Sequence, residues 1–393
     1  MILTAIIFLV ILSALVLIHE LGHFLVAKKL NIKVEEFGFG LPPRIIGVKR
    51  GETIYSINWL PIGGFVKLFG EDDAGGGKVV TKSKELGSKS KKDIGRAFFA
   101  RPVRQRAAVV IAGVVMNTLL AVAIFYVFMF LSGFHTELPL FGHHQFFGVT
   151  QSIKTDITVD SVEKMSPAEL AGIPGGARVI AVNDKKVLDI EDFTTQIKKD
   201  AGEQVKISYI DPKSKKTTSK LVVPRVNPPK GQGALGVSLY GLSTAVLDYK
   251  TPVQKVFSGV IHPANLLVYN FEVIGQLAQA AIKEHNAAPL SEGVSGPVGI
   301  YSIVGAIVKI PDVRQRVIEL LNLAGILSIS LAFFNILPIP ALDGGRLFFI
   351  LIEGVTGKKV DPKYEGIAHS IGMAVLLILI LLVTFKDIFQ FIL

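Results

Sequence analysis

Four long apolar runs interrupt an otherwise mixed pattern of hydrophobic and polar positions. They cover residues 2–26, 107–133, 320–337 and 371–385. Each is at or near the roughly 20 residues that a helix needs to cross a hydrocarbon core of about 30 Å. The pattern therefore predicts a multi-pass α-helical membrane protein with four transmembrane segments, which we place at 1–30, 104–134, 317–353 and 366–390.

The first apolar run is interpreted as a membrane helix rather than a cleaved signal peptide. It starts at Met1 without a preceding basic stretch, and no small-x-small cleavage site comes before residue 19. It also exceeds the roughly 7–15 apolar residues of a typical signal peptide. We therefore expect this helix to remain in the protein.

Short apolar segments alternate with turn residues between the first two runs. Residues 37–43 are broken by glycine and proline, which excludes a regular helix. Residues 53–60 and 65–68 have the pattern of two short strands joined by the turn-prone Pro61-Ile62-Gly63-Gly64. We therefore expect a membrane-associated β-hairpin within residues 31–103, and protein must shield its backbone if it enters the bilayer.

Between the second and third runs the pattern changes to that of a folded domain. Residues 147–226 alternate like strands, and Ser166-Pro167-Ala168-Glu169 opens a short helix, so one α/β domain is expected. Residues 251–286 are weakly amphipathic and are predicted to lie along the membrane or to pack against the spans. A helix inside the folded domain is the alternative. Residues 71–92, polar and rich in glycine and lysine, are expected to form a loop.

Composition and charge agree with a membrane protein. Half of the residues are hydrophobic, 19% are charged and the mean hydropathy is +0.50, which is too apolar for an ordinary soluble enzyme. Lysine and arginine gather between the first and second runs and again between the third and fourth, so both loops are predicted to be cytoplasmic. The α/β domain and both termini then lie outside. We interpret the net charge of +10 as this topology signal and expect no nucleic-acid partner. Because the chain has no cysteine, disulfides and thiolate catalysis are excluded.

The first run ends in a metal-binding pattern, His19-Glu20-Leu21-Gly22-His23. On a helix His19 and His23 project from one face, one turn apart, and can take two corners of a tetrahedral Zn²⁺ site. Glu20 lies beside that face, where a carboxylate can take a proton from activated water. The alternative is a pair of polar histidines at a membrane edge.

A zinc site needs a further ligand, and the best candidate is Asp343. It ends the segment Asn335-Ile336-Leu337-Pro338-Ile339-Pro340-Ala341-Leu342-Asp343, which breaks the third run with two prolines. An ionisable residue at membrane depth indicates function, because burying it there is costly. The alternative is that Asp343 and Gly344 form a turn where the helix leaves the bilayer.

These motifs together resemble the site-2 protease class of intramembrane zinc metalloproteases, most of all the bacterial regulators of sigma-factor signalling. Residues 19–23 match the first motif of the family, and residues 335–345 match its N-x-x-P-x-P-x-L-D-G motif. The resemblance implies that Asp343 is the third zinc ligand. Pro61–Lys67 is similar to the hairpin thought to pair with substrate, which implicates Gly63, Gly64, Phe65, Val66 and Lys67 in substrate binding.

Three further segments carry the resemblance. Residues 37–40 look like the glycine motif of the family, and residues 112–117 are similar to a stretch in which the family has proline where Val114 stands. Residues 147–226 resemble a single circularly permuted PDZ domain. The resemblance thus covers nearly the whole chain.

The function implied is hydrolysis of peptide bonds within or near transmembrane segments. Glu20 is expected to be the catalytic base, and Asn335 to hold the substrate backbone or the developing oxyanion, with capping of the broken helix as an equal alternative. Expected substrates are pre-trimmed single-span proteins, such as anti-sigma factors or signal-peptide remnants, cut first by a site-1 protease. The expected location is the bacterial inner (cell) membrane, with the PDZ-like domain extracytoplasmic.

Other classes of function make different demands on the sequence. A membrane-tethered soluble-type zincin needs a third ligand in the external domain, yet His135, His143 and His144 are predicted to lie across the membrane from His23. A PDZ scaffold with an inactive metal site is disfavoured by the intact Glu20. A zinc-coupled transporter is weaker still, because no charged residues line the other spans.

Overall fold

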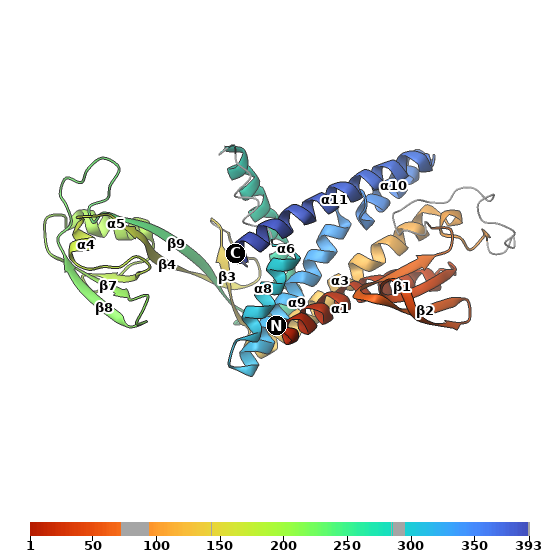
Figure 1. Ribbon diagram of the computed structural model, residues 1–393, viewed down its shortest axis with the longest axis horizontal. Coiled ribbons are helices and arrows are strands. Elements are labelled where there is room, and N and C mark those ends of the chain that lie inside the picture. The colour runs from red at the N-terminus through yellow and green to blue at the C-terminus, as the bar shows by residue number, and fades with distance from the viewer. Residues whose placement is uncertain (72–93, 143, 284, 286–294, 392–393) are drawn as a thin grey trace. The chain divides into compact units, whose positions relative to one another are not determined.

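The computed structural model describes residues 1–71, 94–142, 144–283, 285 and 295–391 (Figure 1). The chain divides into two compact units. Unit 1 comprises Met1–Gly133 and Val256–Leu393, and unit 2 comprises Phe134–Lys255. The loop expected at residues 71–92 lies outside the described residues except for Glu71. His143 also lies outside them.

Unit 1 contains the expected long apolar helices. Among the described residues four helices have the length and composition to cross a membrane: α1 (Ile2–Lys29), α3 (Val103–Leu131), α9 (Val313–Ile336) and α11 (Pro362–Phe391). The prediction of four such helices is confirmed. Helix α9 begins seven residues before its apolar run, because the Asp312 carboxylate accepts a hydrogen bond from Gln315 N–H at 2.6 Å and caps the helix there.

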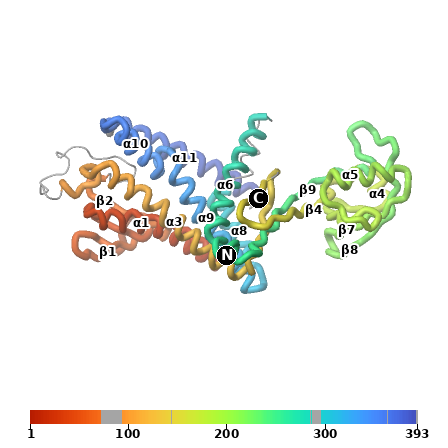
Figure 2. Tube along the Cα trace, turned by 180° about the vertical axis from the view of Figure 1, so that it is seen from behind, coloured from red at the N-terminus to blue at the C-terminus, as the bar shows by residue number. Residues whose placement is uncertain are grey.

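Helix α3 packs against both α1 and α9, and these three helices lie side by side in both views (Figures 1 and 2). Glycine permits the close approach of α1 and α3. A Cβ atom on Gly22 would come within 2.4 Å of the Ala112 carbonyl oxygen, which a side chain cannot do. Small residues of this kind let apolar helices meet at their backbones.

Three shorter or amphipathic helices complete unit 1. They are α6 (Pro252–Lys283, whose first residues belong to unit 2), α8 (Pro297–Val308) and α10 (Asp343–Thr356), with the 3₁₀ turn η1 at Phe98–Ala100. The fully buried His262 of α6 packs its ring against Phe125 and Phe128 of α3, with centroids 4.9 and 6.0 Å away. Helix α6 therefore packs against a predicted span.

The hairpin differs from the one expected. Strand β1 (Val34–Arg50) pairs antiparallel with β2 (Thr53–Leu68), and the turn lies at Gly51 and Glu52. The prediction of two strands at 53–60 and 65–68 joined by 61–64 is wrong, because both strands and the supposed turn belong to β2. Gly63, at φ +74°, is absorbed as an irregularity within the strand.

Residues 36–39 of β1 occupy the middle of this small sheet. Phe37 lies opposite Val66 on one side and opposite Tyr55 on the other. The last residues of β2 consequently form an outer strand, whose only β-partner among the described residues is β1.

Unit 2 is built on a seven-stranded sheet in the order β3-β9-β4-β5-β7-β8, with β6 paired to β5. Its elements are β3 (His135–Leu140), β4 (Thr150–Val162), α4 (Pro167–Leu170), β5 (Arg178–Val182), β6 (Lys185–Lys186), α5 (Ile190–Lys199), β7 (Val205–Ile210), β8 (Thr217–Val222) and β9 (Val237–Asp248). A core that includes Ile157, Phe193 and Tyr209 holds strands and helices together. The sheet extends beyond the predicted 147–226, because β9 pairs with β4 over nearly its whole length. The assignment of this unit as a PDZ domain stays a prediction.

An ion-pair cluster fixes the hairpin turn to the end of α1. Arg96 donates two hydrogen bonds to the Glu52 carboxylate, at 2.6 and 2.8 Å, and Lys28 donates one at 2.9 Å. Arg96 first and Lys28 second lower the pKa of Glu52 to about 2, against the opposing effect of partial burial. This cluster therefore favours the ionised carboxylate.

We predict that Glu52→Gln destabilises unit 1 in a pH-dependent way. Because folding lowers this pKa from its ordinary value of 4.5, the stabilisation is complete above pH 4.5 and is lost as the pH falls toward 2. Thermal melts of parent and variant in detergent should differ at pH 7 and converge at acid pH. Arg96→Gln should reproduce this behaviour, and a Tm difference independent of pH would contradict it.

Candidate metal centre and active site

Two histidines of α1 form the first half of the site. His19 and His23 are buried, and their Nε2 atoms lie 3.2 Å apart. Gly113 of α3 faces both rings, and a Cβ atom there would lie 2.4 Å from His23 Nε2. The backbone of α3 thus makes the space in which the two imidazoles meet.

Asp343 completes the cluster from the first residue of α10. Its Oδ2 lies 2.9 Å from His19 Nε2 and 3.1 Å from His23 Nε2. The turn before it is tight: a Cβ on Gly344 would come within 2.0 Å of the Leu337 carbonyl oxygen. The main-chain N–H of Ala341 donates to Nδ1 of His369 at 2.8 Å, which ties this turn to α11.

The donor set fits zinc. The possible ligand atoms of His19, His23 and Asp343 all lie within 4.8 Å of one another. Two imidazole nitrogens and a carboxylate oxygen are a usual catalytic zinc set, and bonds of roughly 2.0–2.2 Å place tetrahedral ligand atoms roughly 3.4 Å apart. The observed separations of 2.9–3.2 Å are a few tenths of an ångström shorter, so small side-chain movements would admit the ion.

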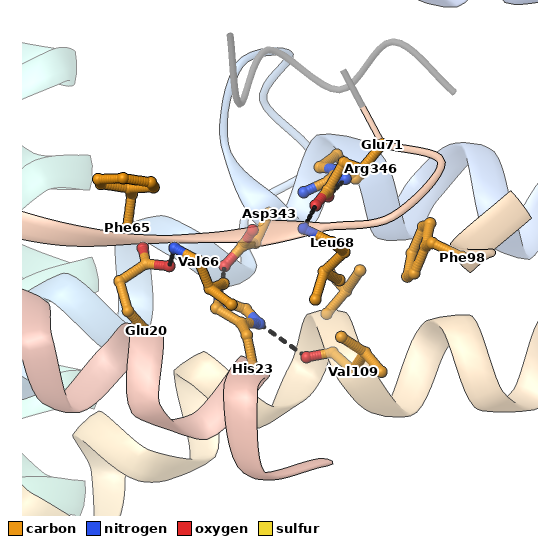
Figure 3. A pocket seen from close by; sticks show the side chains of 11 residues that line it. Glu20, His23, Phe65, Val66, Leu68, Glu71, Phe98, Val109, Asp343 and Arg346 are labelled. Carbon is orange, nitrogen blue, oxygen red and sulfur yellow. Dashed lines mark hydrogen bonds and ion pairs between the residues drawn. The ribbon is translucent and has the colours of Figure 1, made fainter. Parts of the chain in front are cut away.

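The far nitrogens of both imidazoles have partners that orient the rings. His23 Nδ1 donates to the Val109 carbonyl oxygen at 2.7 Å, which leaves Nε2 with a free electron pair for a metal (Figure 3). His19 Nδ1 lies 3.3 Å from the amide of Asn117, a fully buried residue whose Oδ1 has no hydrogen-bond partner among the described residues. Rotation of this amide would let Oδ1 accept from His19 Nδ1 and fix that ring too.

Glu20 and Asn335 flank the cluster. The Glu20 carboxylate accepts a hydrogen bond from Val66 N–H of β2 at 3.1 Å, and Figure 3 shows it beside His23 and Asp343. The Asn335 amide nitrogen, in the last turn of α9, lies 3.5 Å from His19 Nε2. The structure therefore brings together every residue predicted for metal binding and catalysis.

The residues predicted to bind substrate lie along the outer part of β2. Phe65 and Val66 line a cavity of about 130 Å³, together with Glu20, His23 and Asp343. Gly63 and Gly64 sit against α1, where added Cβ atoms would lie 3.2 Å from Val16 and from Leu17. Lys67 does not line this cavity and pairs with Glu35 at 3.7 Å.

Several residues of the site were missed by the sequence analysis. Glu71, Phe98 and Arg346 line the same cavity, and Asn117 contacts His19. Arg346 could have been suspected, since it is a charged residue three positions after Asp343 in an apolar segment. Asn117 offered a weaker signal as a lone amide in an apolar run. Glu71 offered none.

The histidines that a tethered zincin would need belong to unit 2. There His135 contacts Asp248 at 2.8 Å, and the ring of His144 packs against Phe146. Among the described residues Asp343 alone joins His19 and His23 in a metal-binding cluster.

Comparison with known proteins agrees with this geometry. The pattern of peptidase family M50 matches residues 7–379. The chain is 33% identical to a Clostridium acetobutylicum protein named as a candidate zinc metalloprotease, over 96% of this chain and 94% of that protein. It is 30% identical to the zinc metalloprotease RasP of Shouchella clausii, over 98% of each chain. The regulator of sigma-W protease RasP of Bacillus subtilis is 26% identical, again over 98% of each chain.

We predict that the purified protein binds about one zinc ion per chain. His19→Ala, His23→Ala and Asp343→Ala should each lower zinc content severely, because each removes one of three protein ligands. Asn117→Ala should weaken zinc affinity by about 10–100-fold, the usual effect of removing a group that orients a ligand. Metal analysis after dialysis against a chelator measures the zinc content of the ligand variants and the weaker zinc affinity of Asn117→Ala. Normal zinc content in Asp343→Ala would remove this residue from the ligand set.

Proposed function

The chain belongs to peptidase family M50 and is a zinc metalloprotease, and on this premise we propose that it cleaves peptide bonds within or near transmembrane segments. The observation that carries this proposal is the position of the metal cluster. His19 and His23 belong to an apolar helix long enough to span a membrane, and they lie ten and six residues, or roughly 15 and 9 Å, from its Lys29 end. Bonds within the bilayer are therefore the natural substrates of this site.

We assign zinc to His19, His23 and Asp343. When bound, zinc supplies the Lewis acidity that activates water and polarises the scissile carbonyl. Glu20 then takes the proton of the attacking water and delivers it to the leaving amine nitrogen. Its carboxylate lines the same cavity as His23 and Asp343, which supports this role.

Asn335 is assigned to the substrate. Its amide nitrogen points toward the metal cluster, 3.5 Å from His19 Nε2, and this contact favours the substrate role over capping of α9. From that place it can donate a hydrogen bond to the carbonyl undergoing attack or to its neighbour.

The outer strand of β2 is assigned to hold the substrate. A helical substrate keeps its carbonyls in i→i−4 hydrogen bonds and must unwind before hydrolysis. An unwound segment in an apolar medium needs new hydrogen-bond partners, and strand addition supplies them. Phe65 and Val66 of this strand lie beside Glu20, as this role requires.

The proposed substrates are single-span membrane proteins already trimmed by another protease, such as anti-sigma factors or signal-peptide remnants. The name of the Bacillus subtilis relative, regulator of sigma-W protease, supports this class of substrate. We place the chain in the bacterial cell membrane with unit 2 outside, acting as a PDZ-like filter against untrimmed substrates. This orientation rests on the lysines and arginines that flank the predicted cytoplasmic loops.

A cleavage assay tests the activity. Purified protein in liposomes should cut trimmed single-span substrates, and Glu20→Gln should lower kcat by about 10²–10⁴-fold while retaining zinc, since only the base is lost. Mass spectrometry locates the cut. Loss of zinc from Glu20→Gln would make Glu20 structural, and equal activity of the variant would exclude it as the base. An inactive, zinc-loaded parent would instead favour a membrane-anchored scaffold.

Reporter fusions test the orientation. Fusions after Lys92 and after Lys359 should report the cytoplasm, and a fusion near Lys215 should report the outside. Paired phosphatase and fluorescent-protein reporters distinguish the two compartments. An outside signal at Lys92 would invert the topology and place unit 2 in the cytoplasm.

A further inference from the structure

The outer edge of β2 is already occupied in this structure. Successive residues of a strand direct their N–H groups to opposite sides. Phe69 N–H donates to the Lys33 carbonyl oxygen at 2.9 Å, toward the β1 side. Val66 and Leu68 direct their N–H groups to the other side, and both donate to carboxylates, Glu20 at 3.1 Å and Glu71 at 3.3 Å.

Glu71 imitates a neighbouring strand. Its carboxylate accepts from Leu68 N–H, and its own main-chain N–H donates to the Leu68 carbonyl oxygen at 3.1 Å. Gly70, at φ +79°, makes the turn that folds the chain back to this position. One residue thus satisfies both outward main-chain groups of Leu68, which are the groups that an added strand would use.

Arg346 holds Glu71 in place. The two side chains form an ion pair, and both are well buried, with 15% and 6% of their surfaces exposed. The guanidinium lies over the ring of Phe98, 5.6 Å from its centroid. Arg346 belongs to α10, three residues after Asp343 (Figure 3). The Arg346–Glu71 ion pair therefore connects the edge of β2 to the helix that carries a proposed metal ligand.

We propose that Glu71 and Arg346 form a latch that closes the edge of β2. The substrate segment opens this latch when its carbonyl oxygens replace the carboxylates of Glu20 and Glu71 as hydrogen-bond acceptors. This inference rests on the proposed function. A substrate carbonyl displaces Glu71 from Leu68 N–H, and a second displaces Glu20 from Val66 N–H. Glu71 and Arg346 are positioning residues in this scheme, not catalytic ones.

The exchange leaves both edge N–H groups and the buried Arg346 guanidinium with partners. Each edge N–H trades one acceptor for another, and Glu71 stays paired with Arg346 after it leaves Leu68. A buried cation stripped of its partner would be strongly unfavourable. Glu20 is released only when a carbonyl has taken its place at Val66, so the base becomes available as the substrate docks.

The kinetic test compares Glu71→Ala and Glu71→Gln with the parent on one probe. The probe is a synthetic single-span peptide of about 25 leucines and alanines with a central Gly-Gly pair that weakens its helix. In variant protein that retains one zinc per chain, Glu71→Ala should lower KM about tenfold, equivalent to about 1.4 kcal/mol, with kcat changed less than twofold. Glu71→Gln keeps an acceptor for Leu68 N–H but loses the ion pair, so its KM should fall less. Glu36→Gln, which removes a carboxylate of the same hairpin whose ion-pair partner is Arg44, is the matched control and should leave KM unchanged.

A docking test separates this inference from the proposed function, because it needs no turnover. The chain has no cysteine, so Lys67→Cys provides a single thiol that can form a disulfide with a cysteine in the probe. In a Glu20→Gln background, adding Glu71→Ala or Glu71→Gln should raise the yield of crosslinked probe. Parent cleavage with unchanged KM and unchanged crosslinking in both Glu71 variants overturns the latch and leaves the protease intact. Higher crosslinking without parent cleavage supports the latch and overturns the proposed substrate class.

Discussion

The meeting of two imidazoles and one carboxylate inside an apolar helix bundle is the constraint on which the rest of unit 1 depends. His19, His23 and Asp343 are polar groups in a setting where polar groups must find partners in the protein. They do so only if α1 and the start of α10 converge within hydrogen-bond distance. Gly113 and Gly344 then become necessary, because any side chain at either position would occupy the space the cluster or its turn requires.

The same requirement governs the hairpin beside the site. A strand edge exposes N–H groups, and in an apolar medium each unsatisfied group is costly. Here Glu20 and Glu71 accept from Val66 and Leu68, so these two edge N–H groups have acceptors without a neighbouring strand. The proposed docking of an unwound substrate needs such an edge, and the protein needs its N–H groups satisfied when no substrate is present. The carboxylates of Glu20 and Glu71 satisfy the edge N–H groups when no substrate is present, and a substrate carbonyl can replace them as acceptors.

Buried charges elsewhere in unit 1 serve structure. Arg106 of α3 pairs with Glu353 of α10 at 2.5 Å and is almost completely buried. The Arg346–Glu71 pair lies near the start of α10 and the Arg106–Glu353 pair lies near its end. Together they restrict the rotation of this helix, which begins with Asp343. Removing one partner from such a pair is strongly destabilising. Unit 2 has its own core around Ile157 and Tyr209, and none of these ion pairs belongs to it.

The sequence by itself determined the features that depend on neighbouring residues. The four long helices follow from runs of apolar residues, and the one-turn spacing of His19 and His23 follows from helical geometry. Asp343 could be proposed because a carboxylate after two prolines in an apolar run is unusual enough to indicate a function. Only the tertiary structure decided how β1 and β2 pair, since strand partners are chosen by contacts distant in sequence and the turn at Gly51 competes with an equally turn-prone Gly63-Gly64. It alone also identified Asn117, Glu71 and Arg346 at the site, because a buried amide or ion pair is defined by the partner it meets in space, and that partner lies 98 residues away for Asn117 and 275 for Glu71.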